Sequence, residues 1–137
     1  MCSQKRNIEI NSTPDMEEIR SLYKRAKVWW TPENLFEEYI VYRAIHYQVR
    51  NRNGRLIAMG VLDYHSSLKK IVCLCVDKRY QRQGIGKALV KTLLKDGAQL
   101  LDAEKDKVKF YVGFGFKVAY TFDFPIGTRI YRMILRK

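Results

Sequence analysis

The sequence predicts a single mixed α/β domain that spans residues 1–137. Three observations lead to this fold class. Short apolar or alternating segments, typical of strands, recur along the chain, and segments with apolar residues at helical spacing separate them. No repeat, low-complexity tract or linker interrupts this pattern, and hydrophobic residues make up 47% of the chain, enough for one core. We expect the element order β-α-α-β-β-β-α-β-α-β-β, with helices packed on one mixed sheet.

The first third of the chain predicts one short strand and two helices. Residues 8–10 alternate as a strand does. Residues 12–17 form a helix start, because a hydroxyl can cap free amides, proline suits the first turn, and acids favour the positive end of the helix dipole. Apolar residues at helical spacing continue this helix to Ala26. The start signal recurs at residues 31–34, and a second helix follows over about residues 35–43.

The middle of the chain predicts three strands. Residues 45–50 and 56–64 are partners in a hairpin, because Asn51–Gly54 between them tolerates the positive φ of a tight turn. Residues 65–67 turn the chain again. The apolar run at residues 71–76 then predicts a buried strand.

The C-terminal part predicts two helices and three strands. Residues 86–95 carry alanine and leucine along one side of a helix, and Asp96–Gly97 end it. The remaining elements are a strand at 98–101, a short helix over about 105–111, and an antiparallel pair at 116–121 and 128–135.

The junction between the apolar run and the helix at residue 86 carries the strongest functional signal. It has the sequence Q-R-Q-G-I-G-K at residues 81–87. Glycine lets backbone amides approach a ligand closely, and the N-terminus of a helix attracts anions. A strand, a glycine turn and a helix in this order predict a site for the phosphates of a ligand.

Composition narrows the class of protein. The net charge of +12 favours an anionic ligand, but no nucleic-acid-binding motif accompanies it, so we expect no nucleic-acid partner. No apolar run reaches the length of a membrane span, and we expect no membrane partner. The N-terminus lacks the apolar stretch of a secretion signal, and three cysteines make a poor disulfide framework. Both features predict a cytoplasmic protein.

Two motifs make the chain resemble the GCN5-related N-acetyltransferase (GNAT) superfamily in its small, single-domain bacterial form. The first motif, (Gln/Arg)-x-x-Gly-x-(Gly/Ala), is matched by Gln81, Gly84 and Gly86. The second, Phe-Tyr-x-x-x-Gly-Phe, is matched by Phe110, Tyr111, Gly115 and Phe116. The expected element order fits the family along nearly the whole chain. The resemblance implies an enzyme that moves the acetyl group of acetyl-coenzyme A (acetyl-CoA) to a primary amine by direct attack on the thioester, without a metal.

The resemblance also implies a two-part site for coenzyme A. Backbone amides of the turn would bind the pyrophosphate. The strand before the turn would separate from the next strand in the sheet and bond to the pantetheine arm in the gap, as a strand added to a sheet does. The implied contacts are Leu74, Cys75, Val76, Gln81, Arg82, Gln83, Gly84, Ile85, Gly86, Lys87 and Tyr111.

Val76 and Tyr111 are the implied catalytic groups. The N–H of Val76 would stabilise the oxyanion, and the phenol of Tyr111 would protonate the departing thiolate. The general base is harder to assign, because the glutamate that some members carry early in this strand is missing at residues 69–71. Asp63 and His65 are the nearest candidates in the sequence, and a chain of water molecules is the alternative.

Three further positions carry expectations of their own. Glu104 stands seven residues before Tyr111, where many relatives place an asparagine that helps to hold the cofactor. Cys73 and Cys75 lie two apart on a strand and face the same way, and we expect them to be buried small side chains, since no other ligands complete a metal site. Three phenylalanines near the second motif are expected in the core: Phe110, Phe114 and Phe116.

The sequence leaves the acceptor amine unnamed, and aminoglycosides, polyamines, amino acids and protein N-termini all stay open. A second hypothesis is a catalytically idle acyl-CoA-binding sensor or regulatory module, because Glu104 and the missing glutamate depart from the family pattern. A third is a basic nucleic-acid-binding domain that shares only the fold class. The oligomeric state is open as well, and a homodimer is compatible with the resemblance.

Overall fold

Seven strands form one mixed sheet in the computed structural model, which describes residues 8–10, 15–26, 44–65, 67–123 and 127–135. The strand order is β1-β2-β3-β4-β5-β7-β6. The strands are β1 (Ile8–Ile10), β2 (Ala44–Arg50), β3 (Leu56–Asp63), β4 (Lys69–Val76), β5 (Ala98–Glu104), β6 (Phe116–Asp123) and β7 (Arg129–Leu135). Among the described strands, only β4 and β5 pair in parallel. The predicted mixed α/β class is confirmed.

The described helices are α1 (Met16–Ala26), α3 (Ile85–Lys95), α4 (Lys105–Val112) and a short 3₁₀ turn, η2 (Lys78–Tyr80). None of the described helices is long and apolar enough to cross a membrane. The second predicted helix, at 35–43, lies outside the described residues.

Helix α1 begins within the predicted start at residues 12–17, and an aspartate is its cap. Asp15 and Glu18 cap the helix reciprocally: the Glu18 amide donates to the Asp15 carboxylate at 2.8 Å, and the Asp15 amide donates to the Glu18 carboxylate at 3.4 Å. The helix therefore begins at Met16, directly after an aspartate cap and inside the predicted start at residues 12–17, of which residues 12–14 lie outside the described residues.

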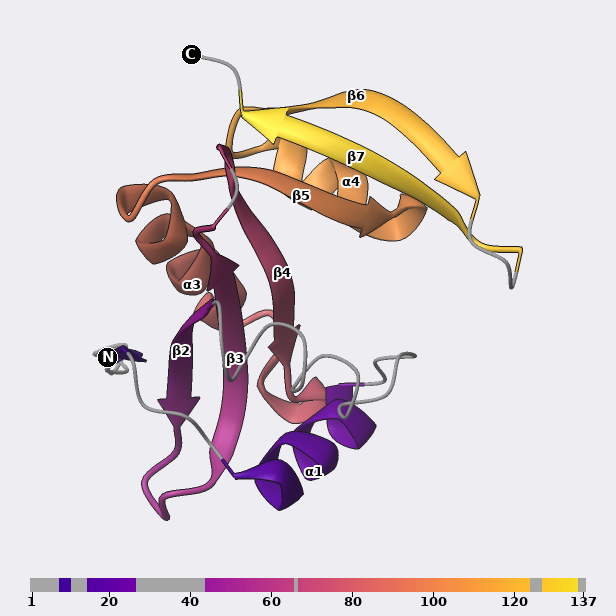
Figure 1. Ribbon diagram of the computed structural model, residues 1–137. Coiled ribbons are helices and arrows are strands. Elements are labelled where there is room, and N and C mark those ends of the chain that lie inside the picture. Colours follow the sequence, from indigo (N-terminus) through magenta and orange to yellow (C-terminus); the bar gives the residue numbers. More distant parts are fainter. Residues whose placement is uncertain (1–7, 11–14, 27–43, 66, 124–126, 136–137) are drawn as a thin grey trace.

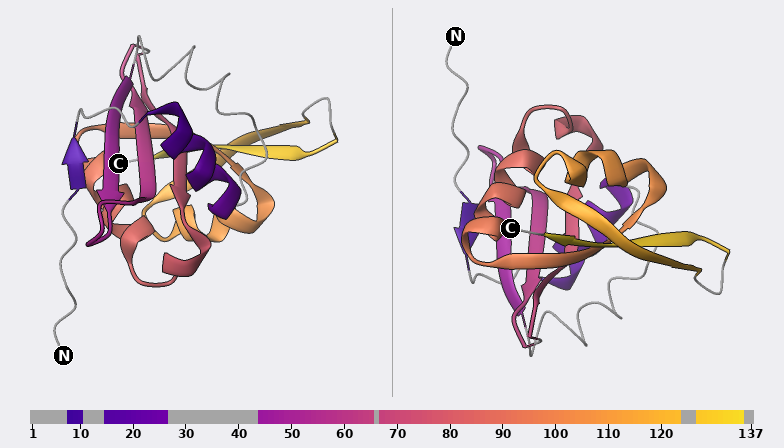
Figure 2. Two further views of the ribbon diagram at one scale, coloured as in Figure 1. Left: turned by 90° about the horizontal axis from the view of Figure 1, so that it is seen from below. Right: turned by 90° about the horizontal axis from the view of Figure 1, so that it is seen from above.

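The sheet forks between β4 and β5. These strands share only three residue pairs, from Lys69–Ala98 to Ile71–Leu101, and then separate. At the same point Val72 has no partner on β3, which makes it a β-bulge that bends β4. We call β1–β4 with α1 and α3 the first arm, β5–β7–β6 with α4 the second arm, and the gap between β4 and β5 the fork (Figure 1). The β6–β7 hairpin projects away from the first arm (Figure 2).

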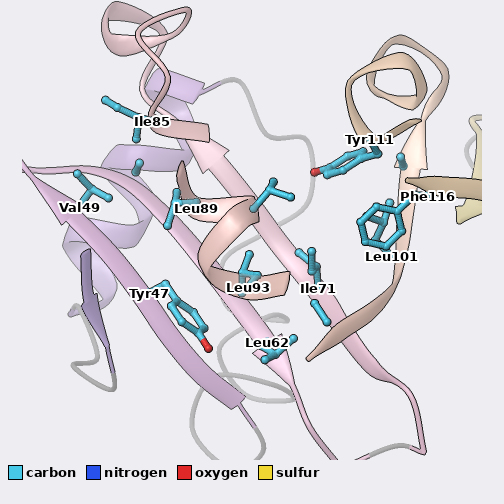
Figure 3. Close-up of a cluster of buried hydrophobic side chains, with 14 of the residues drawn as sticks. Tyr47, Val49, Leu62, Ile71, Ile85, Leu89, Leu93, Leu101, Tyr111 and Phe116 are labelled. Carbon is cyan, nitrogen blue, oxygen red and sulfur yellow. The ribbon is translucent and has the colours of Figure 1, made fainter. Parts of the chain in front are cut away.

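Two apolar clusters pack on opposite faces of the sheet. The cluster beneath α3 and α4 draws buried side chains from both arms, including Leu62 and Leu89 from the first and Leu101 and Tyr111 from the second (Figure 3). The cluster beneath α1 contains only first-arm residues: Ile19, Leu22, Tyr23, Leu56, Met59, Val61, Cys73 and Cys75. The two cysteines are buried, as predicted. Within the described chain, apolar packing therefore joins the arms on the α3/α4 face alone.

Candidate cofactor-binding site at the fork

The turn between β4 and α3 presents a row of free backbone amides. Gly84 is the N-cap of α3 and, as a glycine, supplies no side-chain cap to the first turn of the helix. Arg82 (φ 64°) and Gly84 (φ 83°) both adopt left-handed conformations. Among the described residues, no backbone carbonyl accepts the amide protons of residues 82–87. Left-handed residues in such a turn gather neighbouring N–H groups into an anion-binding concavity, and the helix dipole adds to it.

Side chains around this turn hold its shape. The Gln81 Nε2 donates to the Val76 carbonyl at 3.0 Å, so this predicted cofactor contact organises the turn. Asp77, which is 2% exposed, accepts the Arg79 amide at 3.0 Å and pairs with Arg25 of α1 at 2.7 Å. Sequence reasoning missed Arg25 and Asp77; an acid directly after a buried strand was the available signal.

The other predicted contacts in the turn fall into two groups, those with exposed side chains and one with a buried side chain. The side chains of Arg82, Gln83 and Lys87 are exposed. Gln83 Nε2 donates to the Arg79 carbonyl at 3.4 Å, whereas Arg82 and Lys87 can extend toward a phosphate. Ile85 is 6% exposed within the α3/α4 cluster, so it offers only its amide to a ligand.

After Ile71, no described strand pairs with the edge of β4 that faces β5, and we call this edge open. The Asp77 amide donates to the Ile57 carbonyl of β3 at 2.7 Å. Because backbone groups alternate in direction along an antiparallel strand, those of Cys75 also face β3, whereas those of Leu74 and Val76 point away from it. The structure thus brings the amides of Leu74 and Val76 to the open edge. Cys75 has its backbone turned to β3 and its side chain buried beneath α1.

Gly86 lies between β4 and α4 at the mouth of the fork. A Cβ atom at this position would lie 3.7 Å from Val76 Cγ2 and 3.9 Å from Phe110 Cζ. The start of α3 therefore faces Phe110 of α4 across the mouth. Phe110 is 39% exposed, so its predicted place in the core was wrong, whereas Phe116 is fully buried as predicted.

Tyr111 lies on the second arm, in the α3/α4 cluster. Its ring packs edge-on against Phe110 and Phe116, with ring centroids 5.0 and 6.1 Å apart. Figure 3 shows its hydroxyl directed away from α4, toward the β4 side of the molecule. Burial, together with the nearby Cys73 and Cys75, raises the pKa of Tyr111 above its ordinary value of 10.0. The phenol is therefore protonated at neutral pH and available as a proton donor.

Asp63 and His65 are not brought together with these groups. Asp63 ends β3 opposite Lys70, six residues along β4 from Val76, which is roughly 20 Å of extended strand. Its carboxylate accepts the His65 amide at 2.9 Å, and the exposed His65 ring stacks on Tyr64. The assignment of either residue as general base stays a prediction without support from this geometry.

Comparison with known proteins agrees with this arrangement. The family model described as "Acetyltransferase (GNAT) domain" matches residues 39–118, more than half of the chain. Among proteins with curated descriptions, none matches the sequence significantly.

Similar solved structures are numerous. The ribosomal-protein-S18-alanine N-acetyltransferase from Escherichia coli is 22% identical and superposes with a TM-score of 0.78 over 96% of this chain and 93% of that one. A GNAT family acetyltransferase from Elizabethkingia anophelis with acetyl-CoA bound is 15% identical, with a TM-score of 0.77 over 98% and 100%. The GNAT family protein SP0256 from Streptococcus pneumoniae is 27% identical, with a TM-score of 0.68 over 83% and 89%. With its forked sheet, its amide-lined turn and this family match, the chain belongs to the GNAT acetyltransferases.

Proposed function

We propose that this single domain transfers the acetyl group of acetyl-CoA to a primary amine. One observation carries the proposal: the open edge of β4 runs directly into the row of free amides at residues 82–87. Coenzyme A has the matching parts in the matching order, since its extended pantetheine arm ends in a pyrophosphate. The arm would bond to the amides of Leu74 and Val76, and the pyrophosphate would lie at the start of α3. The bound acetyl-CoA of the Elizabethkingia structure supports this choice of ligand.

The fork supplies groups for each step of the transfer. The neutral amine attacks the thioester carbonyl carbon, and the oxygen that gains charge accepts the N–H of Val76. The tetrahedral intermediate expels the coenzyme A thiolate, which takes its proton from Tyr111. The amine proton leaves through water and restores the phenol, because Asp63 lies at the other end of β4 from Val76. The products are the N-acetylated amine and free coenzyme A thiol.

A protein N-terminus is the acceptor to test first. The Escherichia coli structure that resembles this one is named for the alanine of ribosomal protein S18, and its fold matches along nearly the whole chain. A peptide with a free N-terminal alanine is therefore the leading member of a panel that includes polyamines, amino acids and aminoglycosides.

The second candidate function is an acyl-CoA-binding module without catalysis. The positions of Asp63 and His65, at the far end of β4 from Val76, favour it, since neither predicted base is then close to the proposed oxyanion site. Such a module would bind acetyl-CoA through the same turn and edge.

Two measurements test the proposal. Acetyl-CoA at millimolar concentration should raise the melting temperature by mass action, and release of free thiol should then depend on one class of amine. Thermal stabilisation without thiol release from any amine in the panel would select the binding module. Absence of any thermal shift would contradict both functions.

A further inference from the structure

An ion cluster crosses the fork on the face that lacks shared apolar packing. Arg132 of β7 donates two hydrogen bonds to the carboxylate of Asp102 on β5. The Nε–Oδ1 distance is 2.7 Å and the Nη2–Oδ2 distance is 2.8 Å. Lys70 of β4 lies 2.8 Å from the same carboxylate. The side chains of all three are only 21–26% exposed. Three strands and both arms therefore meet at one carboxylate.

The cluster stands at the point where the strands separate. Ile71 and Leu101 are the last pair between β4 and β5, and both side chains belong to the α3/α4 cluster. Because neighbours on a strand face opposite sides, Lys70 and Asp102 lie on the other face of the sheet, beside that last pair. Asp102 is the first residue of β5 that is free of β4.

This ionic link differs in kind from the apolar link on the α3/α4 face. Apolar contact is non-directional and tolerates sliding, whereas a bidentate Arg–carboxylate pair fixes both distance and angle. Burial by itself would raise the pKa of Asp102, but the bonds from Arg132 and Lys70 outweigh it and hold the pKa below its ordinary value. The carboxylate is thus ionised, and the link intact, at neutral pH.

We propose that Lys70, Asp102 and Arg132 are positioning residues that fix the opening of the fork and so the seating of the pantetheine arm. The inference rests on the proposed use of acetyl-CoA. The phosphates bind at the turn, and Lys70 is roughly 20 Å of strand from Val76 at the end of β4. The cluster therefore acts on the arm and its thioester while leaving the phosphate site untouched.

Two ligands separate this role from a general contribution to stability. Acetyl-CoA carries the arm, whereas 3′-phospho-ADP carries the same phosphates without it. In titration calorimetry well below the melting temperature, Asp102→Ala should weaken acetyl-CoA binding about tenfold and leave 3′-phospho-ADP within about twofold of wild type. Lys70→Arg, which keeps the cation, should retain near-wild-type acetyl-CoA affinity.

The matched control is Asp123→Ala. It breaks the Arg129–Asp123 pair at 3.2 Å, an exposed pair between β6 and β7 of the same arm, and should change neither affinity. If Asp102→Ala fails to fold, Lys70→Gln leaves the Arg132–Asp102 pair in place and should still weaken acetyl-CoA selectively, by about threefold.

Two results would overturn the inference. Equal weakening of both ligands would show that the cluster serves stability alone, and unchanged acetyl-CoA affinity would show that the fork needs no such link. If the wild type itself binds no acetyl-CoA, the proposed function fails and this inference with it. If the wild type binds acetyl-CoA but the variants weaken both ligands equally, this inference alone is contradicted and the proposed function stands.

Discussion

The two arms of the sheet supply the site with different kinds of chemistry. The first arm offers backbone groups: the amides of Leu74 and Val76 on an open edge and those of residues 82–87 in the turn. The second arm offers side chains, with the Tyr111 phenol on one face and the Asp102 ion cluster on the other. The proposed function therefore assigns cofactor binding mainly to the first arm, and proton transfer and alignment of the cofactor to the second.

This difference predicts that the backbone groups of the first arm and the Tyr111 phenol of the second can be impaired separately. A change to the backbone of the first arm should reduce affinity for the cofactor, whereas removal of one second-arm hydroxyl should reduce turnover and leave affinity alone. The predictions below probe that separation.

The largest expected effect is on turnover in Tyr111→Phe. Loss of the proton donor should lower kcat by about 10²-fold, the lower end of the range for general acid catalysis, with the Kd of acetyl-CoA changed less than about twofold. The ring remains, so its packing against Phe110 and Phe116 is kept. Stopped-flow or steady-state thiol release and calorimetry give the two numbers.

Tyr64→Phe is the control for that substitution. Tyr64 is 45% exposed in the turn after β3, and its hydroxyl should affect neither kcat nor Kd. A Tyr111→Phe variant that retains full turnover, or loses affinity and turnover equally, would contradict the assignment of proton transfer to the second arm.

The next effect is on affinity in Gly84→Ala. The residue has φ +83°, and an added Cβ would meet no protein atom within 4 Å. The methyl group would therefore occupy space at the proposed phosphate site, and strain would shift the turn, so acetyl-CoA binding should weaken about tenfold. Turnover at saturating acetyl-CoA should stay near that of wild type.

Gly54→Ala provides a close match for the strain. Gly54 has φ +81° in the β2–β3 hairpin and likewise has no atom within 4 Å of an added Cβ. Both variants should lose a similar free energy of unfolding, about 1–2 kcal/mol, yet only Gly84→Ala should lose cofactor affinity. Similar acetyl-CoA affinities in the two variants would show that this turn does not bind the phosphates.

The smallest effect concerns pH. The proton donor is the protonated phenol, and the raised pKa of Tyr111 moves its loss to higher pH. The ratio of wild-type to Tyr111→Phe kcat should therefore stay constant from about pH 7 to about pH 10.5. A ratio that falls by half near about pH 10 would show an unshifted pKa, and a fall by half at lower pH would show a lowered one.

The sequence predicted the first arm better than the second. The strand-turn-helix at residues 71–95 was predictable, because buried strands, left-handed turn residues and helix starts each leave a local signal in apolar pattern and glycine. Gln81 shows the limit of that reasoning, because its side chain bonds within the turn.

The second arm depends on contacts that the sequence does not reveal. Asp102 and Arg132 are 30 residues apart and meet only through the β5–β7 register, so neither has a local signature. The prediction for Phe110 was wrong for the same reason: its exposure depends on where α4 stands relative to α3. The strand pairing also extends β5 to Glu104, three residues beyond its apolar run.

The most direct test of the account is amide protection along β4 with and without acetyl-CoA. In NMR hydrogen exchange, the amides of Leu74 and Val76 should gain protection on binding, together with amides of residues 82–87. The Cys75 amide already faces β3 and should change little. This odd-even pattern is the predicted result. Acetyl-CoA binding that leaves Leu74 and Val76 unprotected would contradict the open edge of β4 as the cofactor's docking strand.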